Sequence, residues 1–222
     1  MPLPSKPQLF VITGSNGAGK STLKQALLPV DYQHLEVFDG DIFYSKKRNE
    51  FYKIYKSDKE AKKLADEALE EHFIELTAHH LNHQIDFAYE GHFTGPGAWA
   101  VLEKFKLKGF RVNLIFCGLD NVTKSIQRVD IRVKKNGFHV PPLDIENNFY
   151  GNMEMVNRNY RILDTIEVID TSGSILPVCS ISGNEIYTPL LEEDVPKWFK
   201  SGLPNLFDLI YPTNDPKIGE PD

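Results

Sequence analysis

The stretch Gly14-Ser-Asn-Gly-Ala-Gly-Lys-Ser21 limits the possible folds of this chain more than any other segment. It matches the pattern G-x-x-x-x-G-K-[ST], in which glycines let the backbone approach a phosphate and the lysine neutralises its charge. An apolar run, 9–12, directly precedes the motif, and a helix-like stretch, 22–28, directly follows it. Because such a loop needs a strand before it and a helix after it, this context predicts a nucleotide-phosphate site. The alternative is a glycine-rich turn without a ligand.

The residues of this phosphate-binding loop, 14–21, have distinct expected roles. Successive backbone N–H groups would form an anion cradle at the positive end of the following helix. Lys20 should reach the β- and γ-phosphates, the Ser21 hydroxyl should bind Mg²⁺, and Thr22 should contact the α-phosphate or cap the helix. The residues expected to contact the nucleotide are Gly14, Ser15, Asn16, Gly17, Ala18, Gly19, Lys20, Ser21 and Thr22.

Composition narrows the class of protein. The 222 residues, of which 41% are hydrophobic, suit one α/β domain with an extension. A net charge of −6 argues against a protein that follows a nucleic-acid backbone. The sequence has no run of eighteen apolar residues, so no membrane span is predicted. The N-terminus lacks the apolar core of a signal peptide. Two isolated cysteines, Cys117 and Cys179, fit a reduced, cytoplasmic protein.

Predicted strands and helices alternate along the chain. The strands are expected at 8–13, 35–38, 85–89, 111–117 and 166–170. The helices are expected at 20–28, 58–83, 96–108, 121–135 and 143–163. Such alternation implies a parallel sheet with right-handed crossovers and a ligand site at the carboxyl ends of the strands. The sequence therefore predicts an α/β chain with the P-loop NTPase fold, a five-stranded, mostly parallel sheet flanked by helices.

The C-terminal part has a different pattern. Two short runs, 175–180 and 185–188, flank Ser182-Gly183-Asn184 and predict a β-hairpin. A helix is expected at 192–201, and the Pro- and Asp-rich tail from Pro212 is expected to be mobile. We therefore divide the chain into a P-loop kinase-like domain, 1–174, and an extension, 175–222, that packs on the same domain.

Missing motifs separate the classes of phosphate-loop protein. The chain has no guanine-reading [NT]-K-x-D motif and no L-S-G-G-Q-like transporter signature. Asp170-Thr-Ser-Gly173 fits D-x-x-G, but it follows the fifth predicted strand, too late for a GTPase switch. Acidic residues at strand ends and spaced arginines on a helix instead favour a small kinase, which needs a base for the acceptor hydroxyl and cations for the phosphoryl group.

The acidic candidates follow the second and third predicted strands. Asp41 is the candidate base for the acceptor hydroxyl, and Asp39, otherwise a substrate contact, is the alternative. Ordinary turn chemistry also explains an Asp-Gly-Asp sequence. Glu90 ends the next strand and could hold the acceptor or a metal-bound water, or serve only the turn.

The basic candidates lie further along the chain. Arg128 and Arg132 are four residues apart, so they share one helix face and could neutralise charge on the transferring group. A solvated basic face is the alternative. His139, on the following loop, is a candidate substrate contact, although a loop histidine is more often simply exposed. The run 46–48 favours a solvated surface, and the histidines at 79, 80 and 83 favour a packing helix over a metal site.

Together these segments resemble the zeta-toxin family of phosphate-loop kinases, especially its predicted-ATPase branch. The resemblance runs from about 8 to about 173. Its segments are Gly14 to Thr22, Phe38-Asp-Gly-Asp-Ile-Phe43, Tyr89-Glu-Gly-His-Phe-Thr94, Lys108 to Leu114, Arg128 to Val133, Gly137-Phe-His-Val-Pro141 and Ile169 to Gly173. The first segment is common to phosphate-loop proteins, whereas the ordered set is specific to the family.

The resemblance implies an ATP- and Mg²⁺-dependent kinase that phosphorylates a hydroxyl of a small molecule such as UDP-N-acetylglucosamine. It implies that Asp41 is the base, that Glu90 and the segment with Thr94 contact the substrate, and that Arg128 contacts phosphate. It also implies that a small helical antitoxin could block the nucleotide site. The stretch 145–150 lacks the arginines usual in the branch, and His92 stands where a Thr or Ser is usual. The rival hypotheses are an ATP-binding regulatory protein without phosphotransfer and a polynucleotide or nucleoside kinase.

Overall fold

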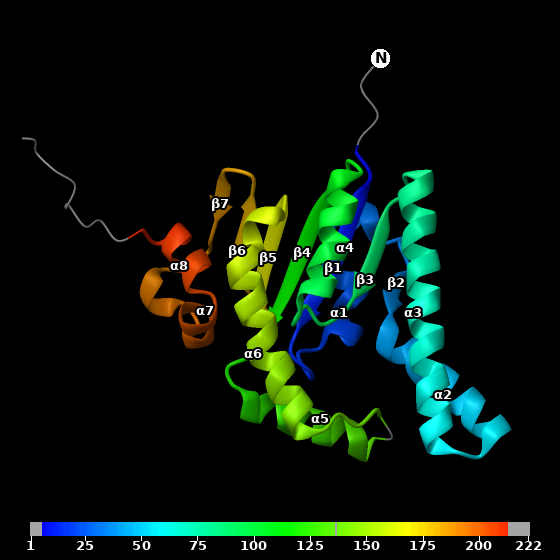
Figure 1. Ribbon diagram of the computed structural model, residues 1–222. Helices are drawn as coiled ribbons and strands as arrows, with labels where there is room; N and C mark the ends of the chain where they lie inside the picture. Colours follow the sequence, from blue (N-terminus) through cyan, green and yellow to red (C-terminus); the bar gives the residue numbers. More distant parts are fainter. Residues whose placement is uncertain (1–5, 136, 213–222) are drawn as a thin grey trace, which may run out of the picture.

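The computed structural model describes residues 6–135 and 137–212. Within these ranges one sheet of seven strands runs in the order β2-β3-β1-β4-β5-β6-β7 (Figure 1). The strands from β1 to β5 are parallel, β6 pairs antiparallel with β5, and β7 pairs antiparallel with β6. Their bounds are β1 Gln8–Gly14, β2 Val37–Asp39, β3 Phe87–Glu90, β4 Arg111–Gly118, β5 Thr165–Asp170, β6 Leu176–Ser182 and β7 Glu185–Tyr187.

Helices connect and cover the strands. Figure 1 shows α4 and α6 across one face of the sheet, the α2–α3 pair at the β2 end, and α7 and α8 at the other end. No helix in the described ranges combines the length and apolarity needed to cross a membrane. The α-helices are α1 Lys20–Leu27, α2 Gly40–Tyr55, α3 Asp58–His83, α4 Pro96–Leu107, α5 Val122–Lys134, α6 Pro142–Asn159, α7 Lys197–Gly202 and α8 Pro204–Ile210, and short 3-10 helices span Val30–Tyr32, Tyr160–Ile162 and Glu192–Asp194.

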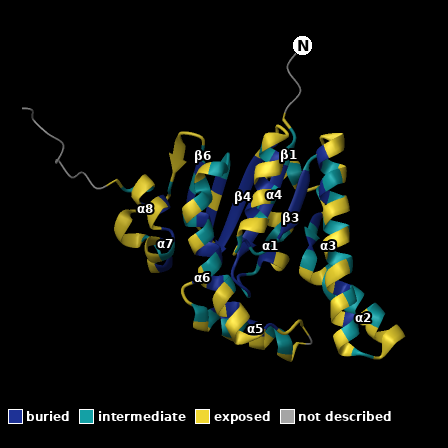
Figure 2. Ribbon diagram, in the orientation of Figure 1, coloured by how far each residue is buried: buried dark blue, intermediate teal, exposed yellow. Residues whose placement is uncertain are grey.

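Strand β1 occupies the centre of the sheet. Its residues Leu9, Val11 and Ile12 are completely buried between β3 and β4 and the covering helices, as Figure 2 shows by the dark blue of the central strands. A strand covered on both faces needs a nearly continuous apolar run rather than alternation. The apolar run before the phosphate-binding loop is therefore the most deeply buried part of the sheet, and it fixes where the loop begins.

The predicted α/β fold is confirmed, but the predicted number of strands was wrong. The sheet has seven strands because the expected hairpin, β6–β7, continues it beyond β5 instead of standing apart. Register pairs such as Thr165↔Ser182 and Ile166↔Ile181 supply the backbone partners that the outer edge of β5 would otherwise lack. The tail predicted from Pro212 lies, apart from that residue, outside the described residues.

Two helices were not predicted. Residues 40–55, expected to follow a simple turn, form α2, which begins where the Asp39 carboxylate accepts a hydrogen bond from the backbone N–H of Ile42 at 3.1 Å. This is an N-cap, in which a side-chain oxygen satisfies a free donor of the first turn. Helix α8 begins with Pro204, a favourable first helical residue. The expected helix over 192–201 is a 3-10 turn followed by the short α7.

The C-terminal extension packs against the sheet through Trp198 of α7. Its indole stacks on Phe116 of β4, with 5.9 Å between the ring centroids. A Cβ atom on Gly118, at the end of β4, would lie 2.1 Å from the same indole. The end of β4 and α7 therefore fit together only because residue 118 has no side chain.

We expect Gly118→Ala to destabilise the protein. The added methyl overlaps the Trp198 ring, and overpacking of this kind costs roughly 1–3 kcal/mol of unfolding free energy. Gly173→Ala is the matched control, because no atom lies within 4 Å of its new Cβ. Urea denaturation of both variants measures the difference, and a wild-type midpoint for Gly118→Ala would contradict the described packing of α7.

Candidate functional site

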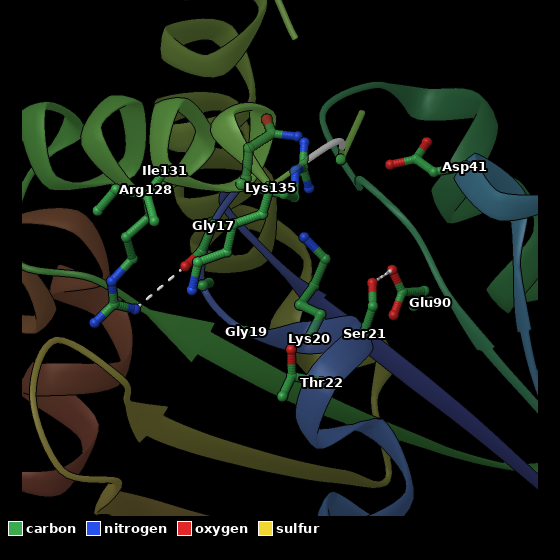
Figure 3. A pocket seen from close by; sticks show the side chains of 14 residues that line it. Gly17, Gly19, Lys20, Ser21, Thr22, Asp41, Glu90, Arg128, Ile131 and Lys135 are labelled. Carbon is green, nitrogen blue, oxygen red and sulfur yellow. Dashed lines mark hydrogen bonds between the residues drawn. The ribbon is translucent and has the colours of Figure 1, made fainter. Parts of the chain in front are cut away.

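The phosphate-binding loop lies beside a cavity of about 380 Å³ at the carboxyl ends of the parallel strands (Figure 3). Elements distant in the sequence surround it, namely the loop and the start of α1, the start of α2, the end of β3, and α5. This is the position at which open parallel sheets bind ligands. The lining residues are 16–22, Asp41, Glu90, Arg128, Ile131, Arg132, Lys135 and Gly137.

Two glycines let the loop pack closely against its neighbours. Gly14 has a φ of +137°, and a Cβ atom there would lie 2.1 Å from the carbonyl oxygen of Cys117 on β4. Gly17 has a φ of +73°, and its Cβ would lie 2.8 Å from the Cβ of Arg128 on α5. Helix α1 then begins after Gly19, with no side-chain cap and no acidic residue in its first turn. The first N–H groups of α1 are thus left to an anion.

Lys20 brings a positive charge into this cradle. Its side chain is buried, and its Nζ donates to the carbonyl oxygens of Gly14 at 2.9 Å and Ser15 at 3.0 Å. Burial lowers the pKa of Lys20, and the negative charges of Glu90 and Asp41 oppose that shift. Figure 3 shows the ammonium group directed into the cavity, between the loop and α5. The loop carbonyls therefore orient the lysine toward the ligand space.

Ser21 and Glu90 form the other end of the cradle. The Ser21 hydroxyl donates to Oε1 of Glu90 at 2.7 Å (Figure 3). Oε2 of Glu90 is buried and has no hydrogen-bond partner among the described residues. Burial raises the pKa of Glu90, while the Ser21 hydrogen bond and the Lys20 charge oppose the rise. A buried carboxylate oxygen without a partner is costly, and a bound cation would offset that cost.

The two aspartates of the Asp-Gly-Asp sequence lie in different environments. Asp39 is buried, and its oxygens accept from the Ile42 backbone N–H and from Lys24 Nζ at 3.4 Å. Asp41 lies in the first turn of α2 with an exposed side chain that lines the cavity, and Figure 3 shows it across the cavity from Lys20. The carboxyl group is nevertheless partly desolvated by the surrounding walls, which raises the pKa of Asp41 despite the opposing charge of Lys20.

The two arginines of α5 are held by backbone carbonyls. Arg128 donates to the carbonyl oxygen of Gly17 at 3.2 Å, and to those of Thr171 and Ser172 at 2.7 and 3.0 Å. Arg132 donates twice to the carbonyl oxygen of Phe138, at 3.1 and 2.7 Å. Arg128 thus joins the phosphate-binding loop to the segment after β5, whereas Arg132 fixes the loop that follows α5.

A second cavity, of about 570 Å³, adjoins the first and shares Ser21, Asp41 and Arg132 with it. Its remaining wall comes mostly from α2, a helix that the sequence patterns did not predict. The residues that line only this cavity are Asp39, Ile42, Ser45, Lys46, Asn49 and Phe138. The spacing of 42, 45, 46 and 49 is the pattern of one helix face, which is the signal that could have identified them.

Two predicted substrate residues do not line either cavity. Thr94 is exposed beside Gly151 of α6, where a Cβ on the glycine would come within 3.0 Å of the threonine methyl. His139 is exposed on the loop between α5 and α6. The structure therefore brings together Lys20, Ser21, Asp41, Glu90 and the α5 arginines, and leaves these two outside the group.

Solved structures share the fold. The PezAT chromosomal toxin–antitoxin system of Streptococcus pneumoniae aligns with 17% identity and a TM-score of 0.54, over 93% of this chain and 88% of that chain. The AvrRxo1-ORF1:-ORF2 complex with ATP aligns with 17% identity and a TM-score of 0.60, over 99% of this chain and 67% of that chain. A search of curated proteins gives no match.

The family itself follows from the sequence model. The model described as zeta toxin matches residues 1–177, which include the loop, all five parallel strands and the residues of both cavities. The match covers well over half of the 222 residues, so this chain belongs to the zeta toxin family.

Proposed function

We propose that this protein transfers the γ-phosphoryl group of ATP to a hydroxyl of a small molecule. The observation that carries the proposal is the position of Asp41, which lines both the cavity of the phosphate-binding loop and the adjoining cavity. Phosphoryl transfer requires an acceptor hydroxyl in line with the γ-phosphoryl group, and a group at the place where nucleotide and acceptor meet that can accept the hydroxyl proton. A carboxylate shared by the two cavities meets that requirement.

The first cavity suits the phosphates of ATP. Lys20 and the start of α1 supply positive charge, and the likeness to the AvrRxo1 complex with ATP supports this choice of ligand. The donors also fit Mg²⁺, because the Ser21 hydroxyl lies next to the unpartnered oxygen of Glu90. Mg²⁺ would neutralise charge on the phosphate oxygens, as it does in other P-loop proteins. Ser21 would bind the ion, and Glu90 would orient it directly or through water.

Asp41 is the better candidate for the base. Both oxygens of Asp39 are already engaged, one by the N-cap hydrogen bond and one by Lys24. Asp39 is buried and lines only the second cavity, and its carboxylate holds the N-cap and Lys24, whereas Asp41 lines both cavities. We therefore assign proton acceptance to Asp41, and the positioning of α2 and its first turn to Asp39.

The second cavity suits an acceptor that carries negative charge as well as hydroxyls. Lys46 and Arg132 offer positive charge, Ser45 and Asn49 offer hydrogen bonds, and Phe138 offers an aromatic face. These groups could bind a sugar nucleotide, so UDP-N-acetylglucosamine is the acceptor that we propose to test first. Its phosphates would face the cations, and a sugar hydroxyl would face Asp41.

A protein partner is part of the proposal. The PezAT system contains a toxin and an antitoxin, and the AvrRxo1 structure contains two protein components. We propose that a small antitoxin could cover the nucleotide cavity of this protein and so block phosphotransfer. Expression that is toxic in the wild type and harmless in Lys20→Ala would favour a toxin, the kind of protein that such an antitoxin would block.

We expect Asp41→Asn to lower the rate of phosphotransfer by roughly 10²–10⁴-fold, the usual contribution of a general base. Affinity for ATP should stay close to that of the wild type, because the loop contacts are unchanged. Consumption of ATP is measured with UDP-sugars, nucleosides and short oligonucleotides as acceptors. Asp39→Ala, which removes both the N-cap and the Lys24 pair, should instead lower the unfolding midpoint. Unchanged phosphotransfer in Asp41→Asn would disprove the assignment of the base.

The raised pKa of Asp41 gives a dependence on pH. The base must be deprotonated, so activity should fall as pH decreases through a pKa above the ordinary 3.8. Because folding raises the pKa of Asp41, the protonated carboxyl group contributes to stability below pH 3.8, and this contribution is lost as the pH rises through the folded pKa. At neutral pH the charged carboxylate therefore opposes folding. Asp41→Asn should therefore unfold at a higher temperature than the wild type at pH 7 and not at pH 3. Calorimetry at both values checks this.

Lys20→Ala tests the nucleotide site itself. Removal of the buried ammonium group should weaken ATP binding by at least tenfold and abolish turnover, because no other lysine of the loop can replace it. Isothermal titration with ATP and Mg²⁺ measures the affinity. ATP binding without transfer to any acceptor in the wild type would instead support the rival role of an ATP-binding regulatory protein.

A further inference from the structure

A polar network around His92 lies behind the phosphate-binding loop, and His92 itself lines neither cavity. His92, two residues after β3, has Nε2 3.4 Å from the side-chain nitrogen of Asn16 and Nδ1 3.2 Å from that of Asn152. Asn16 belongs to the loop and lines the first cavity, and Asn152 lies in the middle of α6. One imidazole thus bridges Asn16 of the loop and Asn152 of α6, which are 136 positions apart in the sequence.

The orientation of Asn152 fixes the tautomer of His92. Asn152 is completely buried, and its Oδ1 accepts from the Thr13 hydroxyl at 2.8 Å and the Phe93 backbone N–H at 2.6 Å. Its NH₂ group must then face Gly14, Asn148 and His92, at which Nδ1 is the acceptor. The ring proton of a neutral His92 therefore resides on Nε2.

The proton on Nε2 needs an acceptor on the loop. As placed, the Asn148 amide nitrogen donates to Asn16 Oδ1 at 2.9 Å, and the Asn16 nitrogen faces Nε2. If both amides are turned over, the Asn16 oxygen faces His92 and can accept the Nε2 proton, and its NH₂ group faces the Asn148 oxygen. This exchange of oxygen and nitrogen satisfies all four amide and imidazole groups, because the Asn148 amide can turn in the same way. Hydrogen bonds then run without interruption from α6 through His92 to the loop.

Other contacts make Asn16 the point at which the loop is held. Its backbone carbonyl accepts a hydrogen bond from the Ser125 hydroxyl of α5, while its side chain contacts His92 and Asn148. Asn16 is buried, so none of these groups can be replaced by bulk water without cost.

We propose that His92 is a positioning residue that holds the phosphate-binding loop in its anion-binding shape through the hydrogen bond between its Nε2 and Asn16, while Asn152 sets the tautomer of the ring. The inference rests on the proposed function insofar as the loop binds ATP. It assigns to His92 a role behind the loop, whereas the resemblance places the segment 91–94 at the substrate. The side chain lines neither cavity, so it acts on the ligand only through Asn16.

Two conservative variants separate the halves of this bridge. The side-chain amide of His92→Gln reaches about as far as Nε2, so it can keep the hydrogen bond to Asn16. His92→Asn places an oxygen near the position of Nδ1, so it can keep the bond from Asn152 but is too short to reach Asn16. Loss of the Asn16 bond should weaken ATP binding roughly five- to tenfold. The ATP dissociation constant should therefore be raised in His92→Asn and His92→Ala and nearly normal in His92→Gln.

Titration calorimetry with ATP and Mg²⁺ gives these dissociation constants, and hydrogen–deuterium exchange of the ligand-free protein gives a readout independent of ATP. We expect amides of residues 14–19 to exchange several-fold faster in His92→Asn and His92→Ala than in the wild type and in His92→Gln. His79→Ala, an exposed histidine of α3, is the matched control and should change neither measurement.

The outcomes are distinguishable. The positioning role would be overturned if His92→Gln and His92→Asn changed the ATP dissociation constant and amide exchange equally. It would also be overturned if the changes in ATP affinity only followed the changes in unfolding midpoint. If the wild type fails to bind ATP, the proposed function fails, while exchange at residues 14–19 still decides whether His92 holds the loop. A wild type that binds ATP but transfers no phosphate would leave the inference about His92 intact.

Discussion

The close approach of Gly14 to β4 is the constraint on which the rest of the site depends. Gly14 pairs in register with Cys117, and its Cβ position lies 2.1 Å from the carbonyl oxygen of that residue. Any side chain at position 14 would push the loop away from the sheet. The positions of Lys20 and Ser21 would then change, because α1 starts directly from the loop. The buried centre of the sheet and the ligand cavity are therefore parts of one packing arrangement.

The sequence predicted the parallel strands and the long helix α3, and it missed α2 and α8. Helix α3 was expected at 58–83 and has those bounds, and the five parallel strands were located to within about two residues. Helix α2 was missed because none of its residues is buried, so it carries no apolar stripe. Only the Asp39 cap signalled its start. Its absence from the prediction also concealed Ser45 and Asn49, and thus the second cavity.

The sequence could predict which residues gather at the site where the order of the strands alone determines it. Parallel strands end at the same edge of a sheet, so the acids after β2 and β3 had to gather near the loop between β1 and α1. The partner of each polar atom could not be predicted in this way. Arg128 is held by the backbone carbonyl of Gly17, which comes together with it only in the folded chain. His92 was missed for the same reason, since neither Asn16 nor Asn152 is near it in the sequence.

Local charge, rather than the net charge of −6, determines which ligand this site can take. The carboxylates lie at the ends of β2 and β3 and at the start of α2, whereas Arg128, Arg132 and Lys135 line the α5 side of the cavity. Lys20 lies between the two groups. A polyphosphate on the loop would have cations on its α5 side and would need Mg²⁺ on the side of Glu90. Among the described residues Asp41 forms no salt bridge, so its carboxylate is free to accept a proton in the reaction that we propose.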